Sequence, residues 1–189
     1  MFTIEEYKEA VDFLSTHKKN IVIQNEGDEH AKIIFSGIFK TAEHHVKLAA
    51  NTLRNPVVDS TEYQNSLDIF LHKEGARLDI IINHVPETIS EQSNDNIYQR
   101  LRRNPAYNEG RIRIKSAEGN HFFMGGDQAN PINFCVADGR MYRIEDNIEQ
   151  RTAIVNFNDP IKSEELGKVF DNAFEELTTV VDLKQYFAE

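Results

Sequence analysis

Three consecutive isoleucines, residues 80–82, close a short apolar run that begins at Leu78. Gly75 precedes this run, and a polar stretch over residues 87–96 follows it. A short run that is rich in β-branched residues predicts a strand. Because this run is continuously apolar apart from Asp79, we expect a central parallel strand that is buried on both faces. An α/β fold follows, in which helices cover the sheet.

Helical and strand patterns alternate on both sides of this run. Thr3 and Glu6 have the capping-box spacing, and apolar residues then recur at helical intervals as far as His17. Further helices are predicted over residues 29–41, 59–74 and 97–103. Strands are predicted over residues 20–24, 46–50 and 111–115. This order is typical of a single α/β unit.

The C-terminal third of the chain has a different pattern. Residues 132–136 and 142–144 alternate around Asp138-Gly139, which predicts a hairpin with a two-residue turn. A strand over residues 153–157 and a long helix after Asp159-Pro160 complete the pattern. We expect one domain over residues 20–177, preceded by a helix in residues 1–19. Residues 178–189 are expected to form a short extra helix or a frayed tail.

Composition limits the compartment and the partners. The net charge of -10 repels nucleic acid and anionic lipid at long range, although a local basic patch could still bind them. Cys135 is the only cysteine, so an intramolecular disulfide and a cysteine-ligated metal centre are excluded. No apolar segment has the length of an export signal or a membrane span. The expectation is a soluble, cytoplasmic protein without a membrane partner.

Residues 131–139, with the sequence PINFCVADG, carry a family resemblance. This segment resembles the strand and turn that hold the HxKxxxxD motif of the phospholipase D superfamily, and the element order over residues 20–177 resembles one repeat of that family. The resemblance implies a mixed β-sheet flanked by helices, and a homodimer that brings two motifs together. It also implies a histidine that attacks phosphorus and a lysine that neutralises phosphate charge.

Two of the three motif positions depart from the family pattern. Pro131 occupies the histidine position, and a pyrrolidine ring cannot attack phosphorus. Asn133 occupies the lysine position, where a neutral amide lacks the charge-assisted contact with phosphate. Asp138 matches the motif, but it is also the first residue of the predicted turn. The sequence therefore predicts a degenerate motif without catalytic residues.

A shifted register offers an alternative nucleophile, His121. In that register Phe123 falls at the lysine position and Gln128 at the aspartate position, so one residue of three is again retained. Neither register provides a complete site. A weak catalytic candidate therefore remains at His121, and another at Asp138.

Basic residues concentrate in one part of this acidic chain: Arg100, Arg102, Arg103, Arg111, Arg113 and Lys115. Alternation places Arg111, Arg113 and Lys115 on one face of a strand, where they could bind a nucleotide, a nucleic-acid backbone or an acidic partner. The alternative is a solvated face that pairs with local acids such as Glu109 and Glu118.

The sequence gives little support for a metal site or a reactive thiol. His44 and His45 are adjacent, so they should point to opposite faces of a strand and not share a metal ion. Cys135 lies in an apolar strand, which predicts a neutral core thiol. We expect no metal and no cofactor.

The sequence therefore predicts a catalytically inactive phospholipase D-like domain, a pseudoenzyme, that binds or regulates a partner macromolecule or a phosphate-containing ligand. The first alternative is a phosphodiesterase or nuclease that uses His121. The second is a nucleic-acid-binding module that uses the basic residues 100–115.

Overall fold

The computed structural model describes residues 3–85, 96–118, 124–125, 130–147 and 150–185. Seven strands form one mixed sheet in the order β1-β9-β8-β7-β2-β3-β4. These strands are β1 (Ile23–Asn25), β2 (His45–Ala50), β3 (Arg77–Ile82), β4 (Ile112–Ser116), β7 (Phe134–Ala137), β8 (Met141–Asn147) and β9 (Thr152–Asn156). Two short strands, β5 (Met124–Gly125) and β6 (Asn130–Pro131), pair with each other outside this sheet.

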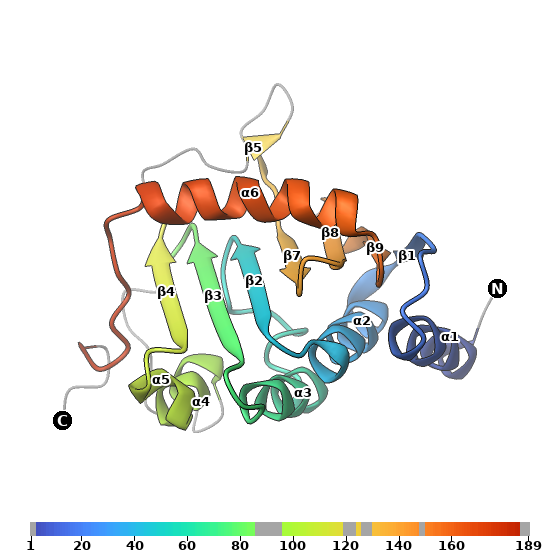
Figure 1. Ribbon diagram of the computed structural model, residues 1–189, viewed down its shortest axis with the longest axis horizontal. Helices are drawn as coiled ribbons and strands as arrows, with labels where there is room; N and C mark the ends of the chain where they lie inside the picture. The colour runs from blue at the N-terminus through green and yellow to red at the C-terminus, as the bar shows by residue number, and fades with distance from the viewer. Residues whose placement is uncertain (1–2, 86–95, 119–123, 126–129, 148–149, 186–189) are drawn as a thin grey trace.

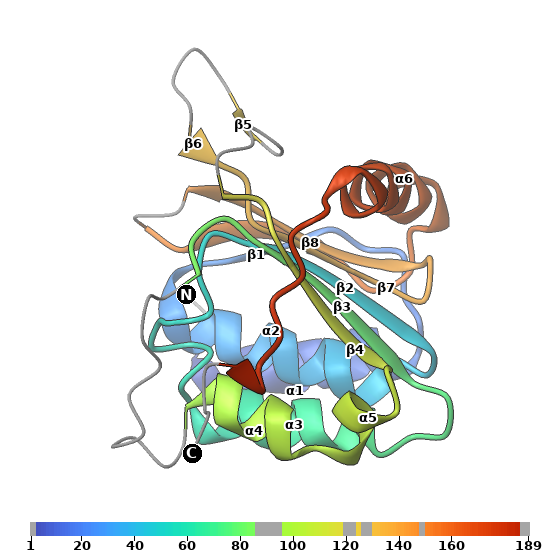
Figure 2. The ribbon, with the colours of Figure 1, turned by 90° about the vertical axis from the view of Figure 1, so that its left-hand side faces the viewer.

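Helices cover both faces of the sheet. Figure 1 and Figure 2 show five helices on one face and one long helix on the other. The first group comprises α1 (Ile4–Thr16), α2 (Gly27–Thr41), α3 (Thr61–Leu71), α4 (Ile97–Arg103) and α5 (Pro105–Asn108). The long helix is α6 (Pro160–Glu176). Within the described residues, no helix is both long enough and apolar enough to cross a membrane.

The sheet topology confirms the predicted central strand. β3 lies between β2 and β4 and is parallel to both, and its residues from Leu78 to Ile82 are buried. β7 pairs antiparallel with β2, and β8, β9 and β1 continue the antiparallel half of the sheet. Because β7 runs against β2, the residue just before β7 lies beside the carboxyl end of β2. This neighbourhood contains the candidate site.

Local signals explain where several helices begin. Thr3 and Glu6 form the predicted capping box of α1, in which each side chain bonds to the other residue's backbone N–H. Ser60 caps α3, and the Asp159 side chain accepts a hydrogen bond at the start of α6, where Pro160 is the first helical residue. The first turn of these three helices therefore follows from the sequence.

Two hydrophobic clusters fill the space on either side of the sheet. The larger cluster lies under the five-helix layer and includes Tyr63 and Cys135, while the smaller one lies under α6 and includes Phe134 and Phe170. The Cys135 side chain is buried, and burial raises its pKa to about 12. This confirms the predicted neutral core thiol.

The first helix and the described part of the tail belong to the same core. Val11 of α1 is fully buried in the larger cluster, and so are Val181 and Leu183 of the tail. The tail is not the predicted helix over its described length, because Val180 forms an antiparallel bridge with Lys115 at the edge of β4. Backbone hydrogen bonds of this kind give partners to some of the N–H and C=O groups at the edge of the sheet, which would otherwise be unpaired.

Two further predictions are corrected in detail. The first strand is shorter and later than predicted, since only residues 23–25 pair with β9. The β7–β8 turn is one residue longer than predicted, because Ala137 pairs with Met141 and leaves three residues between the strands. Asp138 and Gly139 both have positive φ, as the Asp-Gly pattern indicates, and Arg140 is the additional residue.

Candidate functional site

The three motif-related positions lie on different parts of the fold. Pro131 belongs to β6, where its backbone pairs with Met124. Asn133 lies just before β7, beside the carboxyl end of β2, whereas Asp138 follows β7 at its other end. Asn133 and Asp138 are therefore separated by the whole length of β7. His121 lies outside the described residues.

Asn133 holds three strands together through its side chain. Its Oδ1 accepts a hydrogen bond from the backbone N–H of Asn51 at 2.7 Å, and its Nδ2 donates to Oε2 of Glu145 at 2.5 Å. The backbone N–H of Glu145 also donates to the Asn133 carbonyl at 2.9 Å. The amide is thus occupied by protein partners at the position where the family motif places its lysine.

A buried ion pair lies next to this asparagine on β8. Arg143 and Glu145 are 3% and 5% exposed, and Nη2 of Arg143 lies 3.3 Å from Oε1 of Glu145. Nε of Arg143 donates to Oδ1 of Asn25 at 3.1 Å, and the guanidinium lies over the Phe35 ring. Burial lowers the pKa of Arg143, an effect that Glu145 opposes, and the side chain stays cationic. Buried charges require such partners.

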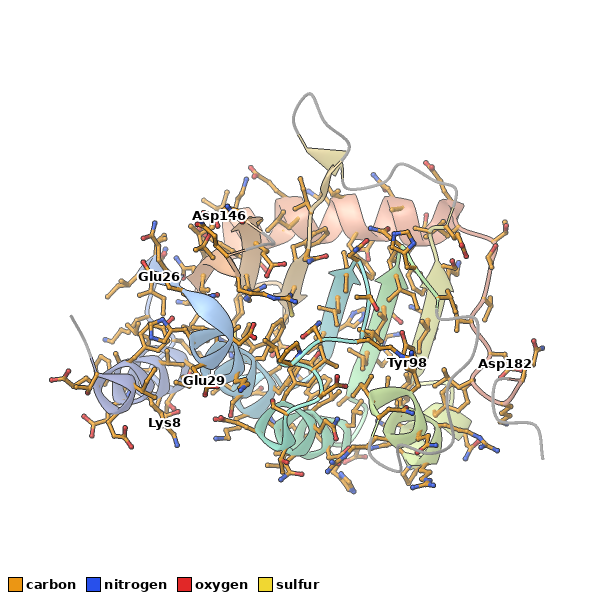
Figure 3. The ribbon with its side chains drawn as sticks, turned by 180° about the vertical axis from the view of Figure 1, so that it is seen from behind. Lys8, Glu26, Glu29, Tyr98, Asp146 and Asp182 are labelled. Atoms are coloured by element: carbon orange, nitrogen blue, oxygen red, sulfur yellow. The ribbon has the colours of Figure 1, made fainter. Side chains whose placement is uncertain are left out.

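A second arginine extends the network toward the surface. Nη1 of Arg151 lies 3.9 Å from Oε1 of Glu145, and its Nε lies 3.4 Å from Oδ1 of Asp28 at the start of α2. The Arg151 side chain is partly exposed, so it marks the outer limit of the network. Glu26, Glu29 and Asp146 lie on the same side of the molecule (Figure 3). The buried pair is therefore linked through Arg151 to Asp28 at the surface.

Sequence reasoning missed Arg143 and Glu145. The alternation of Tyr142 and Ile144 indicates a strand with one buried face, which would place the two charged residues in solvent. The strand is instead buried on both sides, because helices cover both faces of the sheet. The one available signal was the pair of opposite charges two residues apart in a strand that otherwise reads as core.

Asp138 has a structural role at the other end of β7. Its carboxylate accepts hydrogen bonds from the backbone N–H groups of Glu43, His44 and His45, at 2.7 to 3.0 Å. These contacts attach the β7–β8 turn to the segment that leads into β2. The carboxylate thus fixes backbone geometry away from Asn133.

The predicted ligand-binding residues have partners within the chain. Arg111 donates to the carbonyls of Leu71 and Ala76, and its Nε lies 2.7 Å from a Glu109 carboxylate oxygen. Lys115 donates to the carbonyls of Phe174 and Leu177, where α6 ends. A cation at this end of a helix is favourable because of the helix dipole. Both residues therefore stabilise the fold, and a ligand role for them is untested.

Arg113, the third predicted ligand residue, anchors a buried carboxylate. Its Nε and Nη2 donate to the two oxygens of Asp79 at 2.6 and 2.5 Å, and Nε2 of His45 lies 2.8 Å from Oδ2. Burial raises the pKa of Asp79, but hydrogen bonds from His45 and Arg113 and the Arg113 charge together hold it below its usual value. His44 is exposed, so the two histidines point apart as predicted. Among the described residues, no cluster of metal-ligating side chains occurs.

Comparisons with known proteins define the fold. No family model matches the sequence, and no curated protein matches it. The structure is similar to Nuc from Salmonella typhimurium, a phospholipase D family member, with a TM-score of 0.57, 12% identity, and coverage of 85% of this chain and 98% of Nuc. It is also similar to phosphatidylserine synthase from Haemophilus influenzae, with a TM-score of 0.57, 11% identity, and coverage of 89% of this chain and 42% of the synthase.

A third similar structure is TrmBL2, an archaeal chromatin protein with a novel mode of DNA binding. The TM-score is 0.56 at 10% identity, and the match covers 93% of this chain and 61% of TrmBL2. The chain thus spans less than two thirds of TrmBL2 and less than half of the synthase. The chain has a phospholipase D-like fold, an open mixed sheet between two helical layers.

Proposed function

We propose that this chain is a non-catalytic phospholipase D-like domain that binds a partner macromolecule, or a phosphate-containing ligand, without turning it over. The observation that carries the proposal is the hydrogen bonding of the Asn133 side chain. Both polar atoms of its side chain bond to Asn51 and Glu145, so the amide has protein partners where the family motif has a cation. Pro131 offers no nucleophile two residues earlier.

The charge beside Asn133 favours a macromolecular partner over a phosphodiester at this position. Glu145 is buried next to the asparagine, and a phosphate group there would face a carboxylate in a medium of low dielectric constant. Arg143, the buried cation of this network, already pairs with Glu145. We also propose a homodimer, as the family resemblance implies.

Turnover assays test the proposal directly. The purified chain is incubated with bis(p-nitrophenyl) phosphate, with single- and double-stranded DNA, and with phosphatidylcholine vesicles, each with and without Mg²⁺. We expect no turnover above buffer in any arm. Turnover that disappears in His121→Ala, with the melting temperature unchanged, would establish the phosphodiesterase alternative instead.

A nucleic-acid-binding role is the second candidate, and the similarity to TrmBL2 is the observation that favours it. Arg113 is one of the predicted basic residues, and about half of its side chain, 51%, is accessible. Binding of a 20-base-pair duplex is measured at several salt concentrations for the wild type and Arg113→Gln. A steep salt dependence that Arg113→Gln reduces supports this role, and an affinity insensitive to salt excludes it.

A further inference from the structure

A cavity of about 40 Å³ lies between the end of β2, the helices α2 and α3, and the charged residues of β8. Phe35, Leu53, Val57, Val58 and Tyr63 give it an apolar wall, and Asn133, Arg143 and Glu145 give it a polar one. This volume corresponds to about three water-sized positions. A group of about four heavy atoms fits such a space.

Arg143 has unused hydrogen-bonding capacity at this cavity. The side chain is almost fully buried, and its Nε and Nη2 donate to Asn25 and Glu145. Its Nη1 donates to no residue that the structure describes. A guanidinium carries five N–H donors in a fixed plane, so a buried one with an idle nitrogen provides donors for a ligand.

Tyr63 supplies a second unused donor. Only 1% of its surface is exposed, and it packs edge-on against the Phe35 ring that Arg143 covers. Its hydroxyl bonds to none of the residues in the described part of the chain. Burial raises the pKa of Tyr63 above its ordinary value, so the hydroxyl keeps its proton. A buried hydroxyl without a partner is unfavourable until an acceptor reaches it.

The charges around the cavity indicate whether a bound ligand would be an anion, a cation or an uncharged group. Glu145 balances Arg143, and Asp28 balances Arg151, so the network has no net charge. An anion would therefore enter without compensation and beside a carboxylate. The carboxylate that lines the cavity is not free to bind a cation, because both Glu145 oxygens already have partners. On Arg143 and Tyr63, which also line the cavity, the idle groups are donors, and they match an uncharged acceptor.

We propose that this cavity binds the uncharged carbonyl of a small amide, with Nη1 of Arg143 and the Tyr63 hydroxyl as its donors. The inference deepens the proposed function and rests on it, because a chain that processed phosphodiesters beside Asn133 would need to attract an anion there. The apolar wall formed by Phe35, Val57 and Val58 receives the rest of the group.

Three probes of the same shape and different charge test the inference. Acetamide, acetate and acetamidinium are titrated into ¹⁵N-labelled protein, and the backbone amides and the Arg143 Nε–H are followed by NMR. We expect saturable shifts with acetamide at residues that border the cavity. Acetate and acetamidinium should bind at least about tenfold more weakly, because each brings an unpaired charge into a buried site.

Tyr63→Phe removes only the proposed donor, and Tyr142→Phe is the matched control. Tyr142 is also buried, but it lies on the opposite face of the sheet, toward α6. We expect Tyr63→Phe to weaken acetamide binding by about threefold to tenfold with no fall in melting temperature, and Tyr142→Phe to leave binding unchanged.

Three outcomes would overturn the inference. The first is that acetate binds as tightly as acetamide. The second is that Tyr63→Phe and the wild type bind acetamide equally well. The third is that no probe gives a saturable shift, which would indicate that the cavity holds only water. Phosphodiester turnover would refute the proposed function, whereas a lack of acetamide binding without turnover would refute the amide site alone. The two failures are therefore distinguishable.

Discussion

Nδ2 of Asn133 donates a hydrogen bond to Oε2 of Glu145 at 2.5 Å, between the residue that precedes β7 and the neighbouring strand β8. Through Oδ1 the same amide also holds the chain just after β2. A lysine at position 133 could not accept that second bond, because an ammonium group has donors only. The asparagine is therefore a structural element of this sheet.

Removal of this amide should destabilise the fold. Asn133→Ala leaves Oε2 of the buried Glu145 and the Asn51 N–H without their hydrogen-bond partner, and we expect the free energy of unfolding to fall by about 2–3 kcal/mol. Urea denaturation measures the change, with the exposed Asn108→Ala as the control. A loss no larger than that of Asn108→Ala would show that the bonds of Asn133 contribute nothing to stability.

Asp138 should matter for stability in two separable ways. Asp138→Ala removes an acceptor for three backbone N–H groups and places alanine at a positive φ of 53°, so we expect a loss of about 3 kcal/mol. Asp138→Gly relieves only the backbone strain and should be about 1 kcal/mol less harmful. Thermal and urea unfolding of both variants measure these values. Equal stability of the alanine variant and the wild type would contradict the assignment.

Stability should fall at low pH because of Asp79. Its pKa is held below the ordinary value in the folded chain, so the folded state favours the ionised carboxylate. This contribution is fully present above the unfolded pKa of about 4 and is lost as the pH falls through the folded value. Urea unfolding at pH 2 to 7 measures the slope. Asp79→Asn should flatten it below about pH 4, and an unchanged slope in that variant would rule out Asp79 as the cause.

The tail should detach locally when its anchor is removed. The Tyr107 hydroxyl donates to Asp182 at 2.9 Å and accepts from the Leu183 N–H at 2.8 Å. Tyr107→Phe removes both contacts, and we expect faster hydrogen exchange at the Val181 N–H with a global loss of about 1 kcal/mol. Tyr142→Phe is the control. Unaltered exchange at Val181 would mean that burial and the backbone bonds to β4 hold the tail without the Tyr107 hydroxyl.

Much of the fold could be predicted from local patterns. The isoleucines of β3 and the capping box of α1 each depend on residues close in sequence, and both are confirmed. The Asp-Gly turn lies where it is predicted, but it is one residue longer. The order of these elements, together with residues 131–139, was enough to indicate the phospholipase D-like fold. The charged residues of β8 were missed, because the burial of Arg143 depends on which helices cover the strand.

The sequence by itself determined the elements, their order and the absence of a histidine and a lysine at positions 131 and 133. Only the tertiary structure decided that Arg143 and Glu145 form a buried pair. It also decided that Arg113 bonds to Asp79 and that Lys115 bonds to the end of α6. Secondary structure follows from neighbours within a few residues, whereas the burial of a charged side chain depends on the segments that pack around it. Arg113 and Lys115 bond to residues 34 to 62 positions away, and no local spacing encodes those partners.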